Sequence, residues 1–219
     1  MMKKNGFTLA EVLITLAIIG VVATMTLPAL MNNTAEQQYK TGLKKGINTL
    51  TEAANMNQAI DGFDYASITS DNTESQDEQS LFALLAKRTS IDYSRTGQGK
   101  LESNGATGAA SNFAVFLRDG SAIMFNPAKT VINDNSVSKM EDDNLVHGIA
   151  VIYDSNGAKG PNILSNCKGA AQGAEDDGQE DVKTACTGTN RVIKDQFGVR
   201  LRGGYAVPNG EAARWAFDN

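Results

Sequence analysis

One uninterrupted apolar stretch near the start of the chain constrains its fold more than any other feature. Residues 7–31 have the sequence FTLAEVLITLAIIGVVATMTLPALM, in which 18 of 25 residues are apolar and Glu11 is the only charge. The 20 residues from Val12 to Met31 carry no charge. As an α-helix they span about 30 Å, which is the thickness of the hydrocarbon core of a bilayer. We therefore expect residues 7–31 to form a transmembrane helix in contact with lipid.

The residues that flank this stretch predict its orientation. Lys3 and Lys4 precede it, so the positive-inside rule places the N-terminus in the cytoplasm and residues 32–219 outside. A cleaved secretory signal peptide is the main alternative. Such peptides usually have an apolar region of about 7–15 residues followed by a small-residue cleavage site. The stretch here is longer and has no clear site of that kind after it, which favours a single-pass inner (cytoplasmic) membrane protein with an extracytoplasmic head.

Composition excludes several classes of function. One histidine and two cysteines exclude a Cys/His zinc cluster. A net charge of −5 disfavours direct nucleic-acid binding by the chain as a whole. His147 has no nucleophile motif near it, so we expect no enzyme activity and no organic cofactor. A local basic patch remains open, formed by Arg191, Lys194, Arg200 and Arg202.

Glu11 is the one charge inside the predicted transmembrane helix. A carboxylate one turn into a membrane helix is costly unless it is paired or lies at the headgroup level. The helix itself offers no cationic partner. A free amine at Phe7 of a neighbouring copy, made by cleavage of the chain before that residue, would supply one. From the residues alone, Glu11 either lies at the headgroup level or pairs with a cationic partner inside the membrane, and both interpretations are open.

The sequence KKNG followed by FTLAEVLITLAIIGVVA closely resembles the N-terminus of type IV pilins and of type II secretion pseudopilins. The resemblance covers residues 3 to about 31. It implies that residues 1–6 are a leader, that a prepilin peptidase cuts after Gly6, and that the new amine of Phe7 is methylated. It also implies that Glu11 pairs with the Phe7 amine of an adjacent subunit in a filament of this protein or related pilins, built on an inner-membrane assembly platform.

Gly20 and Pro28 correspond to helix-breaking residues of many pilins. Proline removes a backbone donor and crowds the carbonyl of Thr24, and glycine costs about 1 kcal/mol relative to alanine in a helix. Both residues are also common in ordinary membrane helices. The resemblance favours a segment that can extend in a filament.

Beyond Met31 the pattern becomes amphipathic. Apolar residues at spacings of three and four, from Tyr39 to Ala54, predict a stalk helix over residues 32–60. Residues 61–219 are expected to form the head, in which 61–80 is a connecting loop and 78–88 contains a short helix. Alternating patterns and an Asp119-Gly120 turn predict antiparallel strands. The fold class is therefore α+β, with a long N-terminal transmembrane and stalk helix packed on a small antiparallel sheet, which is also the pilin architecture; the strand segments are 112–117, 121–125, 148–154, 191–202 and 204–208.

The segment DSNGAKGPN (residues 154–162) resembles an element of pseudopilin-like heads that is followed by Asp-x-Phe, here Asp195 to Phe197. Asp and Asn in such a turn can bond their own backbone. Alternatively, Asp154 and Asn156 are candidate calcium ligands, because hard cations favour clustered oxygen atoms. Both interpretations stay open.

Cys167 and Cys186 enclose 20 residues in the part predicted to be extracytoplasmic, where disulfides persist. They form no CxxC motif and have no ligating histidines. A disulfide and a pair of free thiols are both possible from the sequence. Pilins often close a C-terminal loop with a disulfide, and the resemblance therefore favours the bond.

Two functions of different classes follow from these patterns. The first is a structural subunit of a type IV pilus-like or type II secretion pseudopilus filament. The second is a monomeric, single-pass binding module that needs neither cleavage after Gly6 nor Glu11. Within the first, the sequence does not choose between a pilus, a secretion pseudopilus and a DNA-uptake pseudopilus.

Overall fold

The computed structural model describes residues 8–71, 73, 79–101, 112–130, 148–167, 186 and 190–219. The chain divides into two compact units, Met1–Gln38 and Tyr39–Asn219. The expected leader, the Phe7 position and His147 lie outside the described residues.

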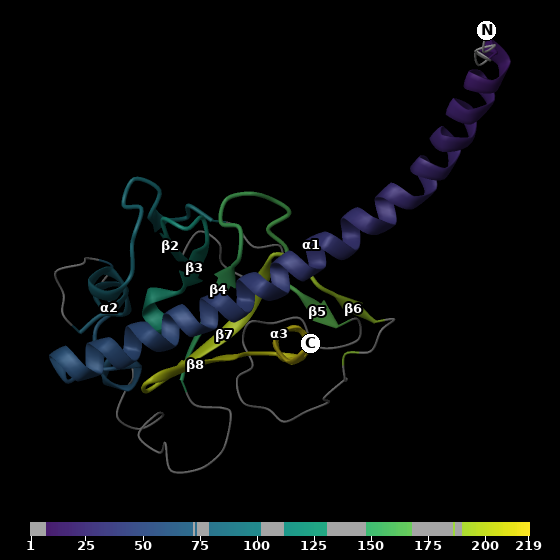
Figure 1. The fold of residues 1–219 in the computed structure, drawn as a ribbon. Coiled ribbons are helices and arrows are strands. Elements are labelled where there is room, and N and C mark those ends of the chain that lie inside the picture. The colour runs from purple at the N-terminus through teal and green to yellow at the C-terminus, as the bar shows by residue number, and fades with distance from the viewer. Residues whose placement is uncertain are drawn as a thin grey trace, which may run out of the picture. The chain divides into compact units, whose positions relative to one another are not determined.

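The longest element is helix α1 (Leu9–Asp61), which contains both the apolar stretch and the amphipathic stripe (Figure 1). The backbone is helical through Gly20 and Pro28. In the second unit, one face of α1 is buried while the opposite face carries exposed polar residues. The buried stripe consists of Leu43, Ile47, Leu50, Ala53 and Ala54.

Among the described residues, six strands form an antiparallel sheet in the order β1-β2-β3-β4-β7-β8, and two more strands pair separately as β5-β6. Together with α1 this is the α+β, pilin-like layout that the sequence predicts. The strands are β1 (Gly97–Gln98), β2 (Phe113–Phe116), β3 (Ala122–Phe125), β4 (Ile149–Asp154), β5 (Asn166–Cys167), β6 (Arg191–Val192), β7 (Gln196–Arg202) and β8 (Tyr205–Pro208).

The predicted hairpin between β2 and β3 is confirmed. Phe113 pairs with Phe125, and the turn between the strands contains Asp119 and Gly120. Gly120 has a φ of 95°, which glycine adopts without strain. The Asp119 carboxylate accepts hydrogen bonds from the backbone N and the hydroxyl of Ser121 at 3.0 and 2.7 Å. The turn is thus fixed by its own side chains.

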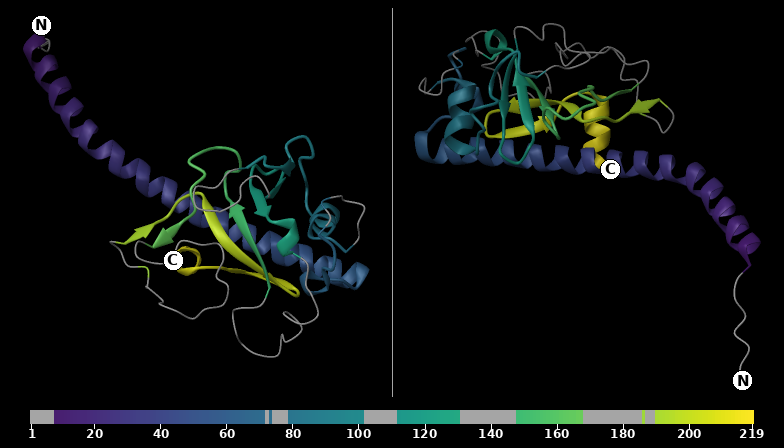
Figure 2. Two further views of the ribbon diagram at one scale, coloured as in Figure 1. Left: turned by 180° about the vertical axis from the view of Figure 1, so that it is seen from behind. Right: turned by 90° about the horizontal axis from the view of Figure 1, so that it is seen from above.

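The six-stranded sheet has apolar side chains on both faces. Its strands alternate, so one set of residues joins the stripe of α1 in the main core, where α1 runs across the sheet (Figure 2). The other set forms a second, smaller cluster on the opposite face. That cluster contains Leu101, Ala114, Phe116, Ala122, Met124, Ile152 and Leu164.

Two glycines let α1 approach β4 closely. A β-carbon at Gly42 would lie 2.6 Å from Cβ of Ser155, and one at Gly46 would lie 2.6 Å from Cε1 of Tyr153. Both distances are shorter than atomic contact allows. The packing of the stalk on the sheet therefore requires these two glycines.

Some local elements differ from the expectation. The connecting loop contains a 3-10 turn, η1 (Tyr65–Ser67), and the buried Tyr65 hydroxyl donates to the backbone O of Leu50 at 2.8 Å. Helix α2 (Leu81–Arg88) begins after Ser80, whose hydroxyl accepts from the backbone N of Ala83. Strands β1 and β5, the turn η3 (Pro127–Lys129) and the C-terminal helix α3 (Glu211–Asp218) were not predicted.

Candidate functional site

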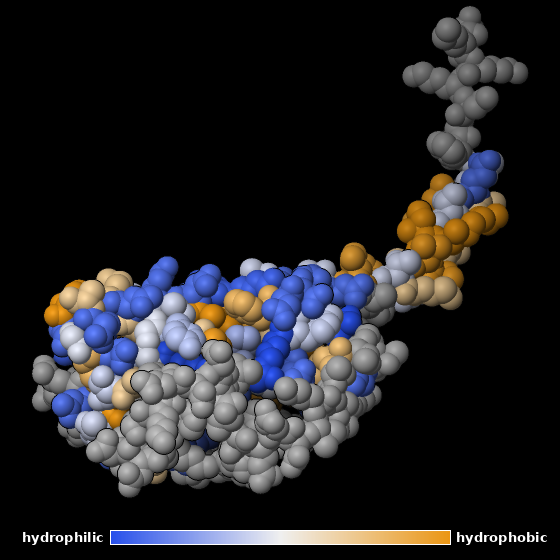
Figure 3. All heavy atoms as spheres, turned by 90° about the horizontal axis from the view of Figure 1, so that it is seen from below, coloured by the Kyte–Doolittle hydropathy of each residue, from blue (hydrophilic) through white to orange (hydrophobic). Residues whose placement is uncertain are grey.

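The N-terminal part of α1 is the first candidate site. Leu9–Leu27 is long and apolar enough to cross a membrane, with a mean hydropathy of 2.2, and none of that stretch is buried within the structure. Apolar side chains gather along this part of α1 in Figure 3, whereas on the face shown the described residues of the second unit include many polar ones among scattered apolar ones. A helix of this kind needs lipid or other helices around it.

Glu11 and Thr8 form a reciprocal cap at the start of α1. The carboxylate Oε2 of Glu11 accepts from the backbone N and from the hydroxyl of Thr8, at 2.8 Å each. The Thr8 hydroxyl in turn accepts from the backbone N of Glu11 at 3.3 Å. This is a capping box, in which side chains at the first and fourth positions satisfy backbone donors that the helix cannot.

The capping box gives Glu11 a structural role that our sequence interpretation missed. Its signal was present as the pattern Thr-x-x-Glu directly before an apolar run. The carboxylate is thus held at the N-terminal end of the helix, which begins two residues after Phe7 in the sequence. The resemblance would place the amine of a cleaved chain at Phe7.

The second candidate site is the turn after β4. Asp154 is fully buried, and its Oδ1 accepts from the backbone N of Asn156 at 3.0 Å. Its Oδ2 accepts from Nε2 of Gln196 at 2.9 Å. Burial raises the pKa of Asp154 to about 7, although these two hydrogen bonds oppose the shift.

The two motifs that the sequence singled out in the head come together at this turn. Asp195 accepts from the backbone N of Asn162 at 2.8 Å and from that of Ile163 at 3.0 Å. Burial, followed by the Asp195 and Asp154 carboxylates, raises the pKa of Tyr39 on α1. The end of the segment 154–163 is therefore bound to Asp195, the residue directly before β7.

The calcium interpretation of Asp154 and Asn156 stays a prediction. Both carboxylate oxygens of Asp154 already accept hydrogen bonds from protein donors. No group of three or more His, Cys, Asp or Glu residues suited to a metal ion occurs within the described ranges. The hydrogen bonds of Asp154 fit the alternative in which its side chain organises the turn, whereas Oδ1 of Asn156 is buried and has no hydrogen-bond partner among the described residues.

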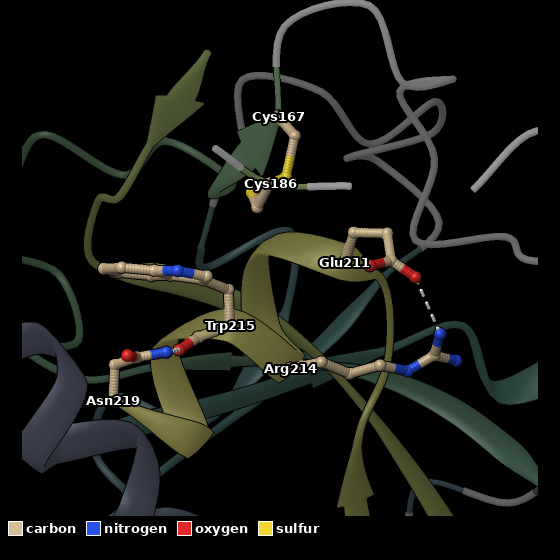
Figure 4. Close-up of a disulfide and its surroundings, with 6 residues drawn as sticks. All are labelled: Cys167, Cys186, Glu211, Arg214, Trp215 and Asn219. Atoms are coloured by element: carbon tan, nitrogen blue, oxygen red, sulfur yellow. Dashed lines mark hydrogen bonds and ion pairs between the residues drawn. A yellow bond between two sulfur atoms is a disulfide. The ribbon is translucent and has the colours of Figure 1, made fainter. Parts of the chain in front are cut away.

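The two cysteines are joined in a disulfide, with their Cα atoms 5.4 Å apart. Cys167 lies on β5 and is buried, and Cys186 packs against the main core. Figure 4 shows the disulfide close to α3, from which the Trp215 indole extends. The bond thus lies next to the C-terminal helix.

The structure shows where two of the four residues of the possible basic patch (Arg191, Lys194, Arg200 and Arg202) lie. Arg200 is only 5% exposed. The guanidinium of Arg191 lies over the Trp215 ring, 4.2 Å from its centroid. Two of the four candidate residues are thus engaged within the head, which weakens the case for a nucleic-acid surface there.

Comparison with known families matches the N-terminus alone. The family model for the prokaryotic N-terminal methylation motif matches residues 1–27. The chain therefore carries the signature of type IV pilins and pseudopilins, a motif that implies assembly with other pilins in a filament. No curated protein and no solved structure matched the chain. The motif and the apolar helix fit a membrane-anchored protein.

Proposed function

We propose that this protein is the precursor of a structural subunit in a type IV pilus-like or type II secretion pseudopilus filament. The observation that carries the proposal is the methylation motif over residues 1–27, which contains a helical stretch, Leu9–Leu27, that is long and apolar enough to span a membrane. In this proposal Lys3 and Lys4 hold the leader in the cytoplasm, the helix anchors the subunit, and the second unit forms the filament surface.

Processing is the first step of the proposed pathway. A prepilin peptidase cuts between Gly6 and Phe7 and methylates the new amine. Residues 1–6 contain both lysines that precede the apolar helix, so cleavage removes the charges that fix the N-terminus at the cytoplasmic surface. Mass spectrometry of protein from membranes with and without the peptidase tests this step. Removal of six residues only when the peptidase is present is the expected result.

Assembly is the second step, and it depends on Glu11. The carboxylate is placed at the helix start by the capping box and pairs with the methylated Phe7 amine of a neighbouring subunit. We expect Glu11→Ala to be processed normally and to be excluded from filaments. Glu52→Ala is the matched control, because Glu52 is exposed on the same helix outside the apolar stretch, and this variant should assemble.

The second candidate is a monomeric, membrane-anchored binding module. It is favoured by the second unit, Tyr39–Asn219, which has a core of its own. Cysteine cross-linking between neighbouring transmembrane helices separates the two functions, for example through Ile18→Cys. Cross-linked chains that depend on both the peptidase and Glu11 support the filament. Monomers under all conditions support the binding module.

A further inference from the structure

We propose that the C-terminal helix α3 is fastened to α1 by a latch around Trp215, and that the Cys167–Cys186 disulfide controls this latch. Nζ of Lys40 lies 4.1 Å from the centroid of the Trp215 ring, and Cζ of Arg191 lies 4.2 Å from it. Two cations over one face would be in like-charge contact, so they occupy opposite faces of the ring. Trp215 thereby connects α1, α3 and β6.

Lys40 is an unusual residue to find inside a protein. Lysine is rarely buried to this extent in proteins, and Lys40 is only 5% exposed. The face of a tryptophan ring is the strongest aromatic partner for a cation, and the attraction grows as water is removed. Lys40 follows Tyr39, where the second unit begins. The latch therefore acts on α1 at the beginning of the head.

The position of Arg191 on the other face of the ring depends on the strand pair β5-β6. Cys167 and Arg191 are directly opposite each other in this antiparallel pair, which places their side chains on the same face. Each strand has two residues, and the pair is extended by Ser165, whose hydroxyl donates to the backbone O of Lys194 at 3.0 Å and accepts from its backbone N at 2.9 Å. The disulfide adds a covalent restraint to this short pair, because it ties Cys167 to Cys186, five positions before Arg191.

The disulfide therefore switches the latch between two states. Oxidation removes two protons and two electrons from the thiols of Cys167 and Cys186 and transfers them to a disulfide oxidant, which becomes a dithiol. In the oxidised chain, Arg191 is held on Trp215 and α3 is fixed on the stalk. In the dithiol chain, β6 keeps its hydrogen bonds to β5 but loses the covalent restraint beside it, Arg191 moves away from the ring, and the half-buried indole becomes more exposed to solvent.

Trp215 is the one tryptophan of the chain, so its fluorescence reports directly on the latch. The full chain in detergent micelles is compared before and after reduction with dithiothreitol. We expect reduction to increase acrylamide quenching and to shift the emission to longer wavelength. The oxidised Arg191→Gln variant should show the same increase in quenching and the same shift in emission. Reduction of that variant should change its quenching and emission little further. Arg95→Gln is the matched control, because it removes a cation that lies 4.4 Å from a different ring, Phe116.

Two results overturn the proposal. One is quenching that stays unchanged after reduction, when titration shows two free thiols. The other is oxidised Arg191→Gln with an indole as shielded as in the parent chain. The second result decides the matter even if the reduced chain unfolds, since that variant keeps its disulfide. Additive effects of reduction and Arg191→Gln would likewise contradict control of Arg191 by the disulfide.

Discussion

The Glu11 carboxylate accepts both the backbone N–H and the hydroxyl of Thr8 through one oxygen, Oε2, at 2.8 Å each. Within the described part of the chain the second oxygen, Oε1, accepts no hydrogen bond, so it can take a cation without loss of the cap. The residue that our proposal pairs with a neighbouring amine is thus held at the helix start within its own chain. This arrangement lowers the entropy that Glu11 loses on assembly, because its side chain is already ordered.

Thr8→Val removes the hydroxyl that completes this cap, whereas Thr8→Ser retains it. Loss of an N-cap hydroxyl typically costs about 1 kcal/mol of helix stability. We therefore expect faster amide hydrogen exchange at Glu11 and Val12 in Thr8→Val, measured by NMR in micelles, and near-parental exchange in Thr8→Ser. Equal exchange in the two variants would contradict the capping box.

Gly46→Ala tests the close approach of α1 to β4. The new β-carbon meets the Tyr153 ring, and overpacking of this kind typically costs about 1–3 kcal/mol, more than the gain of about 1 kcal/mol in helix propensity. The expected result is a lower melting temperature of the head. Gly20→Ala is the control on the same helix, because nothing lies within 4 Å of its β-carbon, and it should not lower that temperature.

Asp154→Asn should remove part of the pH dependence of stability. An unfolded aspartate ionises near about pH 4, whereas burial raises the pKa of Asp154 in the fold to about 7. The folded state holds the extra proton between these values, so the stability contributed by Asp154 falls as the pH rises from about 4 to about 7. Melting temperatures measured across this range should decline less in Asp154→Asn than in the parent chain.

Asp119→Asn serves as the comparison, because Asp119 is expected to affect the pH dependence of stability in the opposite direction to Asp154. Burial alone would raise the pKa of Asp119, but hydrogen bonds from Lys45 and Ser121 outweigh it and lower the pKa. Its ionised form therefore stabilises the fold above about pH 4, and that stability is lost as the pH falls through the lowered pKa. The variant should lose stability at neutral pH and keep the decline assigned to Asp154. If the decline in melting temperature with rising pH disappeared in Asp119→Asn and not in Asp154→Asn, its assignment to Asp154 would be contradicted.

The elements that the sequence predicted well are those whose signals are local. The hairpin around Asp119 follows from strand alternation and a turn that its own side chains stabilise. The stripe from Leu43 to Ala54 follows from helical periodicity. Helix α3 also had a local signal, since EAARWAF contains good helix formers with Ala212 and Ala216 on one face, but it is short and its start at Gly210 has no side-chain cap.

The remaining features depend on residues far apart in the chain. Strand β5 has two residues and pairs with β6 across 24 positions between Cys167 and Arg191, so its sequence alone contains no strand pattern. The burial of Arg200 and the stacking of Arg191 on Trp215 likewise arise from tertiary contacts. At the head turn, the sequence identified Asp154 and Asp195 separately. Only the fold shows that each accepts two hydrogen bonds within one packed turn.

The state of the N-terminus tests the account's central claim most directly. Mass spectrometry of the membrane-extracted chain, produced together with a prepilin peptidase, should find an N-terminus at a methylated Phe7 and no remaining leader. The same chain produced without the peptidase should keep residues 1–6. An intact leader in both samples, or cleavage near Asn32 as for a secretory signal peptide, would contradict the proposed role as a filament subunit.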